Sequence, residues 1–292
     1  MMSKKEDTDK SRKQNFKEMT FWEHLGELRK RLFRIILSVF AMSIIAFLNR
    51  NIIFDKIILA PKDGNFITYR VLCRFGKWLH SLISRLNADS LCMSDTHIKL
   101  INYNLSGQFM THMTISMVAG LILAMPYIFW QLWQFIKPAL YDHERKYART
   151  AVFIMSALFM LGVLFSYFFM VPWTLNFLGT YQVSKLVENQ IALNSYISTV
   201  ISVILSVGAI FELPVIIFVL AKLGIITPKF LIVNRKYAFV IVLILAAVIT
   251  PPDVFSQIIV TIPLWALYEA SILVAKRVTP REEAFDGTVD KE

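Results

Sequence analysis

The chain has 292 residues, of which 56% are hydrophobic and 18% are charged, and its formal net charge is +10. A soluble domain would carry about a quarter of charged residues. The charges are also segregated, because residues 150–184 contain none and residues 189–221 contain only Glu212. These features exclude a soluble globular protein and predict a polytopic membrane protein, while the polar residues 1–20 do not resemble a signal peptide.

Apolar stretches predict an all-α protein with six transmembrane helices, since a span needs about 20 mostly apolar residues. In chain order the predicted spans are Ile35–Asn49, Thr111–Ile136, Thr150–Met170, Thr199–Ala221, Tyr237–Thr250 and Val254–Ala275. No internal repeat is visible, so the sequence does not indicate the inverted-repeat design of many transporters.

The segment before the first span combines apolar residues at helical spacing with many basic side chains. It predicts an amphipathic helix that begins at Thr20 and lies along the membrane surface before turning into the span. Ten Lys and Arg residues precede or enter this first span, whereas the loop between spans five and six has none. We therefore expect both termini in the cytoplasm. The basic charge then reflects topology and anionic lipid, and nucleic acid is a poor candidate partner.

The first external loop, residues 50–104, is long and carries eight basic residues between positions 50 and 99. Long loops are translocated largely regardless of charge, so this does not reverse the predicted orientation. Helical spacing over Tyr69–Leu86 predicts partial order. Cys73 and Cys92 both lie here, and an oxidising compartment would allow a disulfide; two unpaired thiols are the alternative. Pro172 is predicted to begin the next external loop.

The fifth predicted span, Tyr237–Thr250, has 14 residues. As a helix it would be about 21 Å long, against a hydrocarbon core of about 30 Å. In the sixth, Glu269 leaves only a short apolar part after Val254. Two short adjacent spans imply local thinning of the bilayer, which we favour on geometry, or shielding by protein.

Glu212 lies in the middle of the fourth span, two residues before Pro214. A carboxylate near the bilayer centre costs at least about 2.5–3.5 kcal/mol, and no Lys or Arg lies in the other spans to pair with it. Glu212 must therefore be protonated, meet water in a cavity, or accept hydrogen bonds from groups such as Gln131, Gln134 or Gln257. Pro214 frees a backbone carbonyl nearby. Together they predict either a functional polar point in a bundle wall or a neutral glutamate that serves packing alone.

Taken alone, neither Glu27 nor Glu144 indicates a function. Glu27 would form a surface ion pair with Arg31, four residues later, and Glu144 would be a solvated loop charge. The sequence contains no phosphate-binding loop, no nucleophile elbow and no zinc-protease motif. His24 and His143 do not have metal-ligand spacing. We expect no cofactor, no metal and no enzymatic activity.

Four motifs occur in order along the chain: HLGELRKRL at 24–32, FIKPALYDHER at 135–145, FELPV at 211–215 and TPPDVFSQ at 250–257. Together they resemble the TatC family, the six-span core component of the twin-arginine protein translocase. The resemblance covers residues 20–276, which would form the membrane domain, with a cytoplasmic segment at 1–19 and a cytoplasmic tail at 277–292. It implies a concave, glove-like bundle in the cytoplasmic membrane of a bacterium.

The resemblance also implies a function and its residues. Glu27 and Glu144 would face the arginine pair of a signal peptide on folded cargo, and an arginine fork suits carboxylates. Glu212 would face the concave interior, while Thr250 and Gln257 would lie in the docking surface for single-span TatA/TatB-type partners. Further motif positions support the match: Arg29, Phe135, Pro138, Pro214 and Asp253. Transport would use the proton-motive force, and the complex would contain several copies of the chain.

Two departures from the family pattern are visible: the first external loop is longer than usual, and the usual PGL of the cytoplasmic loop is PAL at 138–140. The alternative function is a proton- or cation-coupled transporter of a small solute that uses Glu212. It does not account for the motif contexts of Glu27 and Glu144. An intramembrane enzyme would lack a nucleophile and base.

Overall fold

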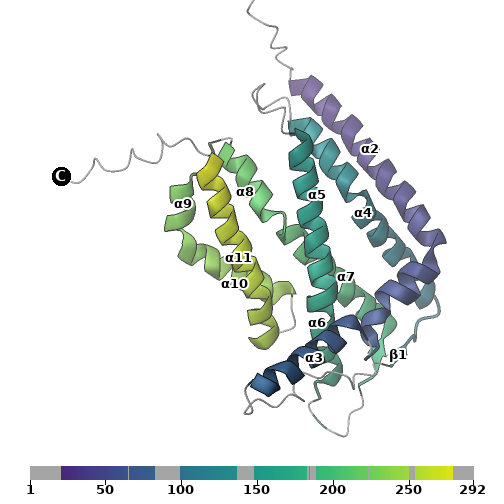
Figure 1. Ribbon diagram of the computed structural model, residues 1–292. Helices are drawn as coiled ribbons and strands as arrows, with labels where there is room; N and C mark the ends of the chain where they lie inside the picture. Colours follow the sequence, from purple (N-terminus) through teal and green to yellow (C-terminus); the bar gives the residue numbers. More distant parts are fainter. Residues whose placement is uncertain are drawn as a thin grey trace, which may run out of the picture.

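The computed structural model describes residues 21–64, 66–82, 99–136, 148–182, 184, 189–222, 224–249 and 254–278, and these are almost entirely helical (Figure 1). The elements in chain order are α2 (Phe21–Leu48), η1 (Asn51–Ile58), η2 (Ala60–Lys62), α3 (Ile67–Leu82), β1 (Leu100–Ile101), α4 (Gly107–Ile136), α5 (Ala148–Phe165), η6 (Ser166–Met170), α6 (Val171–Thr180), β2 (Ile191–Ala192), α7 (Leu193–Ile210), α8 (Leu213–Lys222), α9 (Pro228–Val233), α10 (Arg235–Ile249) and α11 (Val254–Val278).

Within the described residues, four helical stretches are long and apolar enough to cross a membrane: Leu25–Leu48, Gly107–Phe135, Thr150–Thr180 and Leu193–Lys222. They coincide with the first four predicted spans. Helices α10 and α11 form where spans five and six were predicted. With 15 residues α10 is short, as expected, whereas α11 has 25 residues and its most apolar part ends at Glu269. The all-α membrane architecture is therefore confirmed.

Two expected chain breaks are absent. Helix α2 runs without interruption for 28 residues, so the predicted turn between a surface helix and the first span was wrong. Pro172 does not begin a loop either, because the helix continues through η6 and α6 to Thr180. Pro172 lies in the first turn of α6, where the lack of an N–H is tolerated, and the preceding π-helical turn absorbs the change of register.

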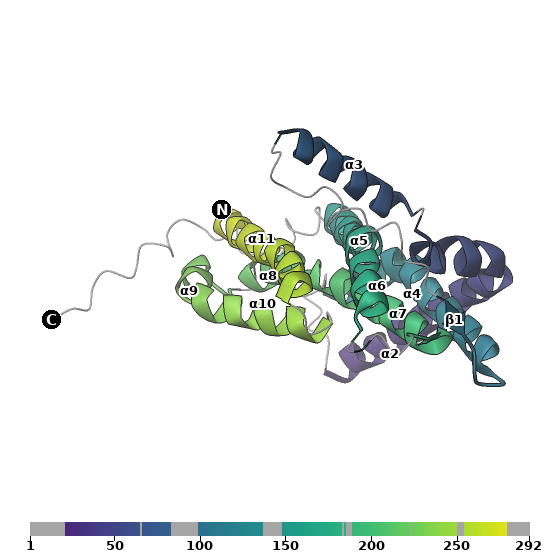
Figure 2. The same ribbon diagram turned by 90° about the horizontal axis from the view of Figure 1, so that it is seen from below.

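Helix α7 lies at the centre of the bundle, with α4 and α5 beside it and the hairpin of α10 and α11 at one edge (Figures 1 and 2). Its Val200, Val203 and Val207 are buried at helical spacing. Small residues allow neighbouring helices to approach closely, as membrane helices commonly do. A Cβ on Gly120 of α4, for example, would lie 2.5 Å from the backbone nitrogen of Ser43 on α2.

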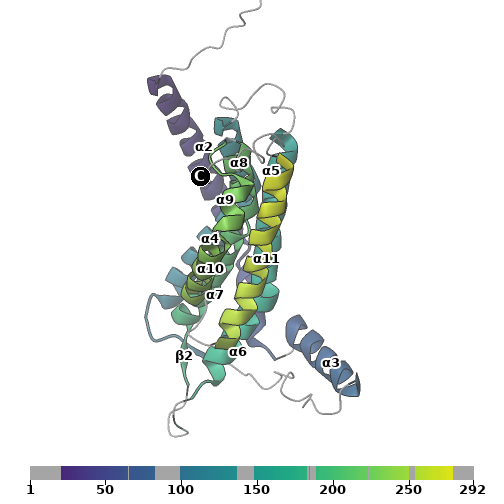
Figure 3. The ribbon, with the colours of Figure 1, turned by 90° about the vertical axis from the view of Figure 1, so that its left-hand side faces the viewer.

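One end of the bundle carries α3, β1 and β2, and we call it the external end, following the predicted topology (Figure 3). Here β1 and β2 pair in parallel, with Leu100 opposite Ile191, and so join two loops distant in sequence. Tyr196 of α7 donates a hydrogen bond to the carbonyl of Ile58 at 2.8 Å. Cys73 of α3 is disulfide-bonded, and Cys92, the chain's other cysteine, lies outside the described residues.

Candidate functional site

Glu27 lies near the beginning of α2, at the end of the bundle opposite α3. The Nε and Nη2 atoms of Arg31, one helical turn later, both donate to Oε1 of Glu27. The other carboxylate oxygen, Oε2, accepts no hydrogen bond from any described residue. The carboxylate is about a quarter exposed, so a second donor can reach it. The ion pair expected from spacing is confirmed, and the described residues leave Oε2 of the carboxylate without a donor.

The motif positions around Glu27 are only partly described. Arg29 is exposed on α2, and Phe135 lies in the last turn of α4, half-buried. Glu144 and Pro138 fall outside the described residues, so the binding of a signal's arginine pair by Glu27 and Glu144 stays a prediction.

Glu212 lies where the fourth span breaks between α7 and α8. Its N–H donates to Ala209, and its carbonyl accepts from the N–H groups of Val215 and Ile216. Pro214 has no N–H to donate to the carbonyl of Ile210, which is the bond an uninterrupted helix would form here. The loss of a backbone hydrogen bond expected from Pro214 agrees with this geometry, and the helix is interrupted at Phe211 and Glu212.

The side chain of Glu212 is buried, since the residue is only 7% exposed. Among the described residues none donates a hydrogen bond to either carboxylate oxygen. Gln131 instead donates to the hydroxyl of Tyr127 at 2.7 Å, and Gln257 donates to a backbone carbonyl on α10. Of the three alternatives for Glu212, hydrogen bonds from Gln131, Gln134 or Gln257 are therefore not formed, and protonation or contact with water stays open.

Close contact between α5 and α7 holds this break in place. A Cβ on Gly162 would lie 2.8 Å from Cγ of Phe211, the residue before Glu212. A Cβ on Gly208 would lie 3.1 Å from the ring of Phe159. The two glycines let the wall close around Phe211, so the position of Glu212 depends on two helices that are distant in sequence.

Gln257 is half-buried in the first turn of α11, and its amide reaches the carbonyl of Leu243 at 3.3 Å. It therefore joins α10 to α11. Thr250 and Asp253, which precede it in the same motif, lie outside the described residues. The predicted docking surface is thus described only at Gln257.

An ion pair that we did not predict also joins this hairpin. Arg235, the first residue of α10, donates to Glu269 of α11 at 2.7 Å. A signal was present in the sequence, because Glu269 lies inside a predicted span and Arg235 lies two residues before its neighbour span. Antiparallel adjacency brings the two together. Over the described residues, no group of three His, Cys, Asp or Glu side chains could hold a metal ion.

Comparison with known proteins agrees with this fold. Residues 23–263 match the family described as Sec-independent protein translocase protein (TatC). The chain is 41% identical over 265 residues to the TatC protein of Blattabacterium from Periplaneta americana, covering 91% of this chain and 98% of that one. It is 35% identical to the TatC protein of Carboxydothermus hydrogenoformans, over 91% of this chain and 96% of that one.

Among solved structures, the chain resembles a crystal structure described as the twin-arginine translocase receptor TatC. The TM-score is 0.58 and the identity 34%, with 88% of this chain and all of that one covered. Family match, relatives and fold agree over most of the length. The chain therefore belongs to the TatC family and is a membrane-embedded, non-enzymatic component of a twin-arginine protein translocase.

Proposed function

We propose that this chain is the receptor subunit of its translocase and binds the arginine pair of signal peptides through Glu27 and Glu144. In this proposal both chain termini are in the cytoplasm of a bacterium, and the chain crosses the cytoplasmic membrane six times. Family membership and a related structure described as a receptor support the proposal.

The observation that carries the proposal is the half-used carboxylate of Glu27. Arg31 already shows that a guanidinium fits against it, and Arg31 occupies only Oε1. A second guanidinium could bind Oε2, to which no described residue donates. A charge-assisted hydrogen bond of this kind contributes about 1.5–3 kcal/mol, so one such contact raises the affinity for a guanidinium by roughly tenfold or more.

The proposal gives Glu212 the role of a polar contact for another helix. Its two carboxylate oxygens, which have no hydrogen-bond donor within the described part of the chain, lie at the break between α7 and α8. A helix with a hydroxyl or amide side chain at the matching depth would supply the missing donor. We assign that helix to the signal's apolar segment or to single-span TatA/TatB-type partners, with Thr250 and Gln257 as their docking surface. Several copies assemble in the complex, and the proton-motive force drives transport.

The test is photocrosslinking of the chain in lipid bilayers to a signal peptide with an Arg-Arg pair, beside the same peptide with Lys-Lys. The double variant Glu27→Ala, Glu144→Ala is compared with Asp55→Ala, which removes an exposed carboxylate at the other end of the bundle. We expect crosslinks at both glutamates that are lost with Lys-Lys and with the double variant, and kept with Asp55→Ala. Binding that ignores both changes would refute the receptor site.

The buried carboxylate of Glu212, without a donor among the residues that the structure describes, also favours a second candidate, a proton- or cation-coupled transporter of a small solute. Intramembrane carboxylates commonly mark ion pathways. Vesicles that contain this chain alone decide the matter, because a transporter would give saturable, pH-driven solute flux that is lost in Glu212→Gln. A receptor subunit would give none.

A further inference from the structure

Helix α3, in the long external loop, exposes an apolar face that its own sequence builds. Ile67, Val71 and Trp78 are 54%, 60% and 57% exposed. At 3.6 residues per turn these three positions fall within about 40° of one another around the helix. We call them the apolar stripe. It lies opposite the buried face of α3, which contains Tyr69 and Gly76.

A second stripe runs beside the first and is basic. Arg70, Arg74 and Lys77 are all exposed and lie within about 60° of one another. None makes an ion pair or a side-chain hydrogen bond with a described residue. This basic stripe accounts for three of the eight basic residues in the long loop, whose translocation does not depend on charge.

Hydrogen bonds fix the depth at which α3 begins. Thr68 donates to the carbonyl of Phe168 at 2.5 Å, and Tyr69 donates to those of Pro61 and Pro172 at 3.1 and 3.2 Å. Burial raises the pKa of Tyr69 to about 12, so its hydroxyl remains a donor at neutral pH. The beginning of α3 is thus held at the level of η6.

If the third span enters the hydrocarbon at Thr150, as the sequence predicts, that level is the edge of the hydrocarbon core. The third span starts its uncharged run at Thr150. Twenty residues of helix, about 30 Å, cross the hydrocarbon and end near Met170. Phe168 and Pro172 lie on either side of this point, so α3 starts at the boundary between acyl chains and headgroups.

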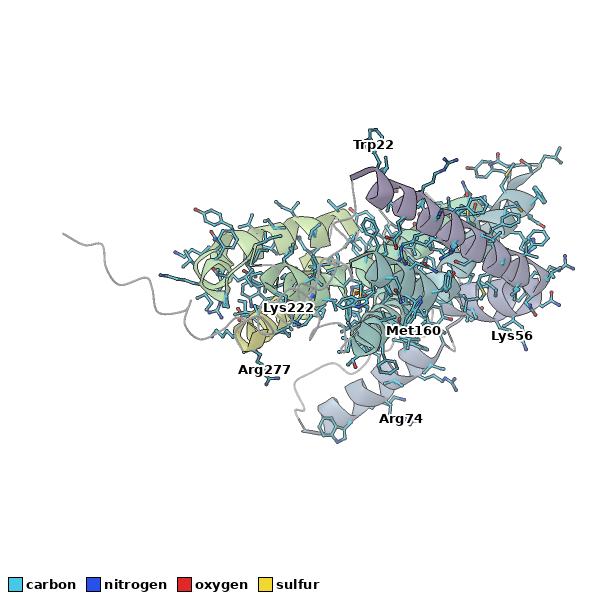
Figure 4. All side chains as sticks on the ribbon, turned by 90° about the horizontal axis from the view of Figure 1, so that it is seen from above. Trp22, Lys56, Arg74, Met160, Lys222 and Arg277 are labelled. Carbon is cyan, nitrogen blue, oxygen red and sulfur yellow. The ribbon has the colours of Figure 1, made fainter. Side chains whose placement is uncertain are left out.

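From this anchor α3 projects sideways and slopes toward the external end, away from the bundle (Figure 3). Figures 2 and 3 show it separate from the other helices at the external end. In Figure 4, seen from the opposite end, Arg74 lies outside the outline of the spans. A helix at this depth and beside the bundle meets lipid.

We propose that α3 is an interfacial helix that binds anionic phospholipids in the leaflet at the external end. The apolar stripe inserts among the upper acyl chains, and the basic stripe contacts headgroup phosphates. Adjacent apolar and basic stripes suit a helix that binds an anionic lipid surface, because insertion of the apolar side chains and attraction of the basic ones then act together. The proposal depends on the placement of the spans in the membrane and not on signal recognition, so either can fail alone.

The test uses Trp78 as a local probe in the full chain, reconstituted in phosphatidylcholine with or without phosphatidylglycerol. The emission of Trp78 is obtained by subtracting the spectrum of Trp78→Phe. We expect quenching by lipids brominated on the upper acyl chain, stronger when phosphatidylglycerol is present. The triple variant Arg70→Gln, Arg74→Gln, Lys77→Gln should lose roughly half or more of that phosphatidylglycerol-dependent increase, because each basic residue adds attraction to an anionic surface.

The matched control is Lys229→Gln, Lys236→Gln, Lys276→Gln, which removes three exposed charges at the other end of the bundle and should leave the Trp78 signal unchanged. The proposal would be overturned if brominated lipid does not quench the emission of Trp78 and aqueous acrylamide quenches it freely. If quenching is the same with and without phosphatidylglycerol, and the same in the triple variant, α3 does not select anionic phospholipids. Shielding of Trp78 in detergent that rises with protein concentration would instead identify a second copy as the partner.

Discussion

Glu27 and Glu212 show two opposite settings for a carboxylate in one protein. Glu27 is partly exposed near a helix start and shares one oxygen with Arg31. Glu212 is buried at a helix break, and neither of its oxygens has a donor among the described residues. Water and a counter-charge make the first inexpensive, whereas the second costs folding free energy that packing must offset. A carboxylate that recognises charge, such as Glu27, can therefore lie at the rim of the bundle, near the beginning of α2, at little cost in stability. A buried carboxylate in the wall of the bundle, such as Glu212, destabilises the folded protein.

The largest effect is expected at the rim. Glu27→Ala and Glu144→Ala should each weaken binding of an Arg-Arg peptide by about tenfold or more, because each removes a charge-assisted hydrogen bond. Stability should change by less than about 0.5 kcal/mol, as for most surface changes. Fluorescence anisotropy gives the affinity and thermal unfolding in detergent gives the stability, with Asp55→Ala as the control. Unchanged affinity in both variants would show that Glu27 and Glu144 do not bind the arginine pair.

The second effect concerns the wall. Glu212→Leu should stabilise the protein by about 1–3 kcal/mol, since it replaces an unsatisfied buried carboxyl by an apolar group of similar size. Export activity should fall. Glu212→Gln keeps a polar group there and should stabilise little. Chemical denaturation gives the stability of both variants. A leucine variant less stable than the glutamine variant would mean that Glu212 has a partner in the membrane.

A pair of glycines sharpens the comparison through packing. Gly162→Ala places a Cβ 2.8 Å from Phe211, beside Glu212, and should destabilise by about 1–3 kcal/mol through overpacking. Gly26→Ala, beside Glu27, meets nothing within 4 Å. It should stabilise by up to about 1 kcal/mol through helix propensity. Thermal unfolding of both variants tests this. Stability changes of the same sign would show that the two regions are packed alike.

The smallest effect is the ion pair itself. A double-mutant cycle of Arg31→Gln and Glu27→Gln should give a coupling of about 0.3–0.5 kcal/mol, which salt should screen. A coupling well above about 1 kcal/mol that persists in salt would place Glu27 in a drier setting than its exposure indicates.

Prediction from sequence succeeded where local composition decides. Apolar length located the spans, and Pro214 located the break next to Glu212. It failed where helix continuity depends on neighbours. Pro172 was expected to begin a loop, yet a π-helical turn and the first turn of α6 accommodate it. At Glu212 the sequence offered nearby glutamines as partners, but Gln131 and Gln257 bond elsewhere.

By itself the sequence determined the membrane class, the positions of the spans and the motifs of the family, because each depends on residues adjacent along the chain. Only the tertiary structure decided which groups meet. Arg235 joins Glu269 across 34 positions, and Gly162 admits Phe211 from another helix. Such contacts depend on which helix faces pack together. The same holds for the buried carboxylate of Glu212, which finds no donor among the described residues although the sequence places glutamines in neighbouring helices.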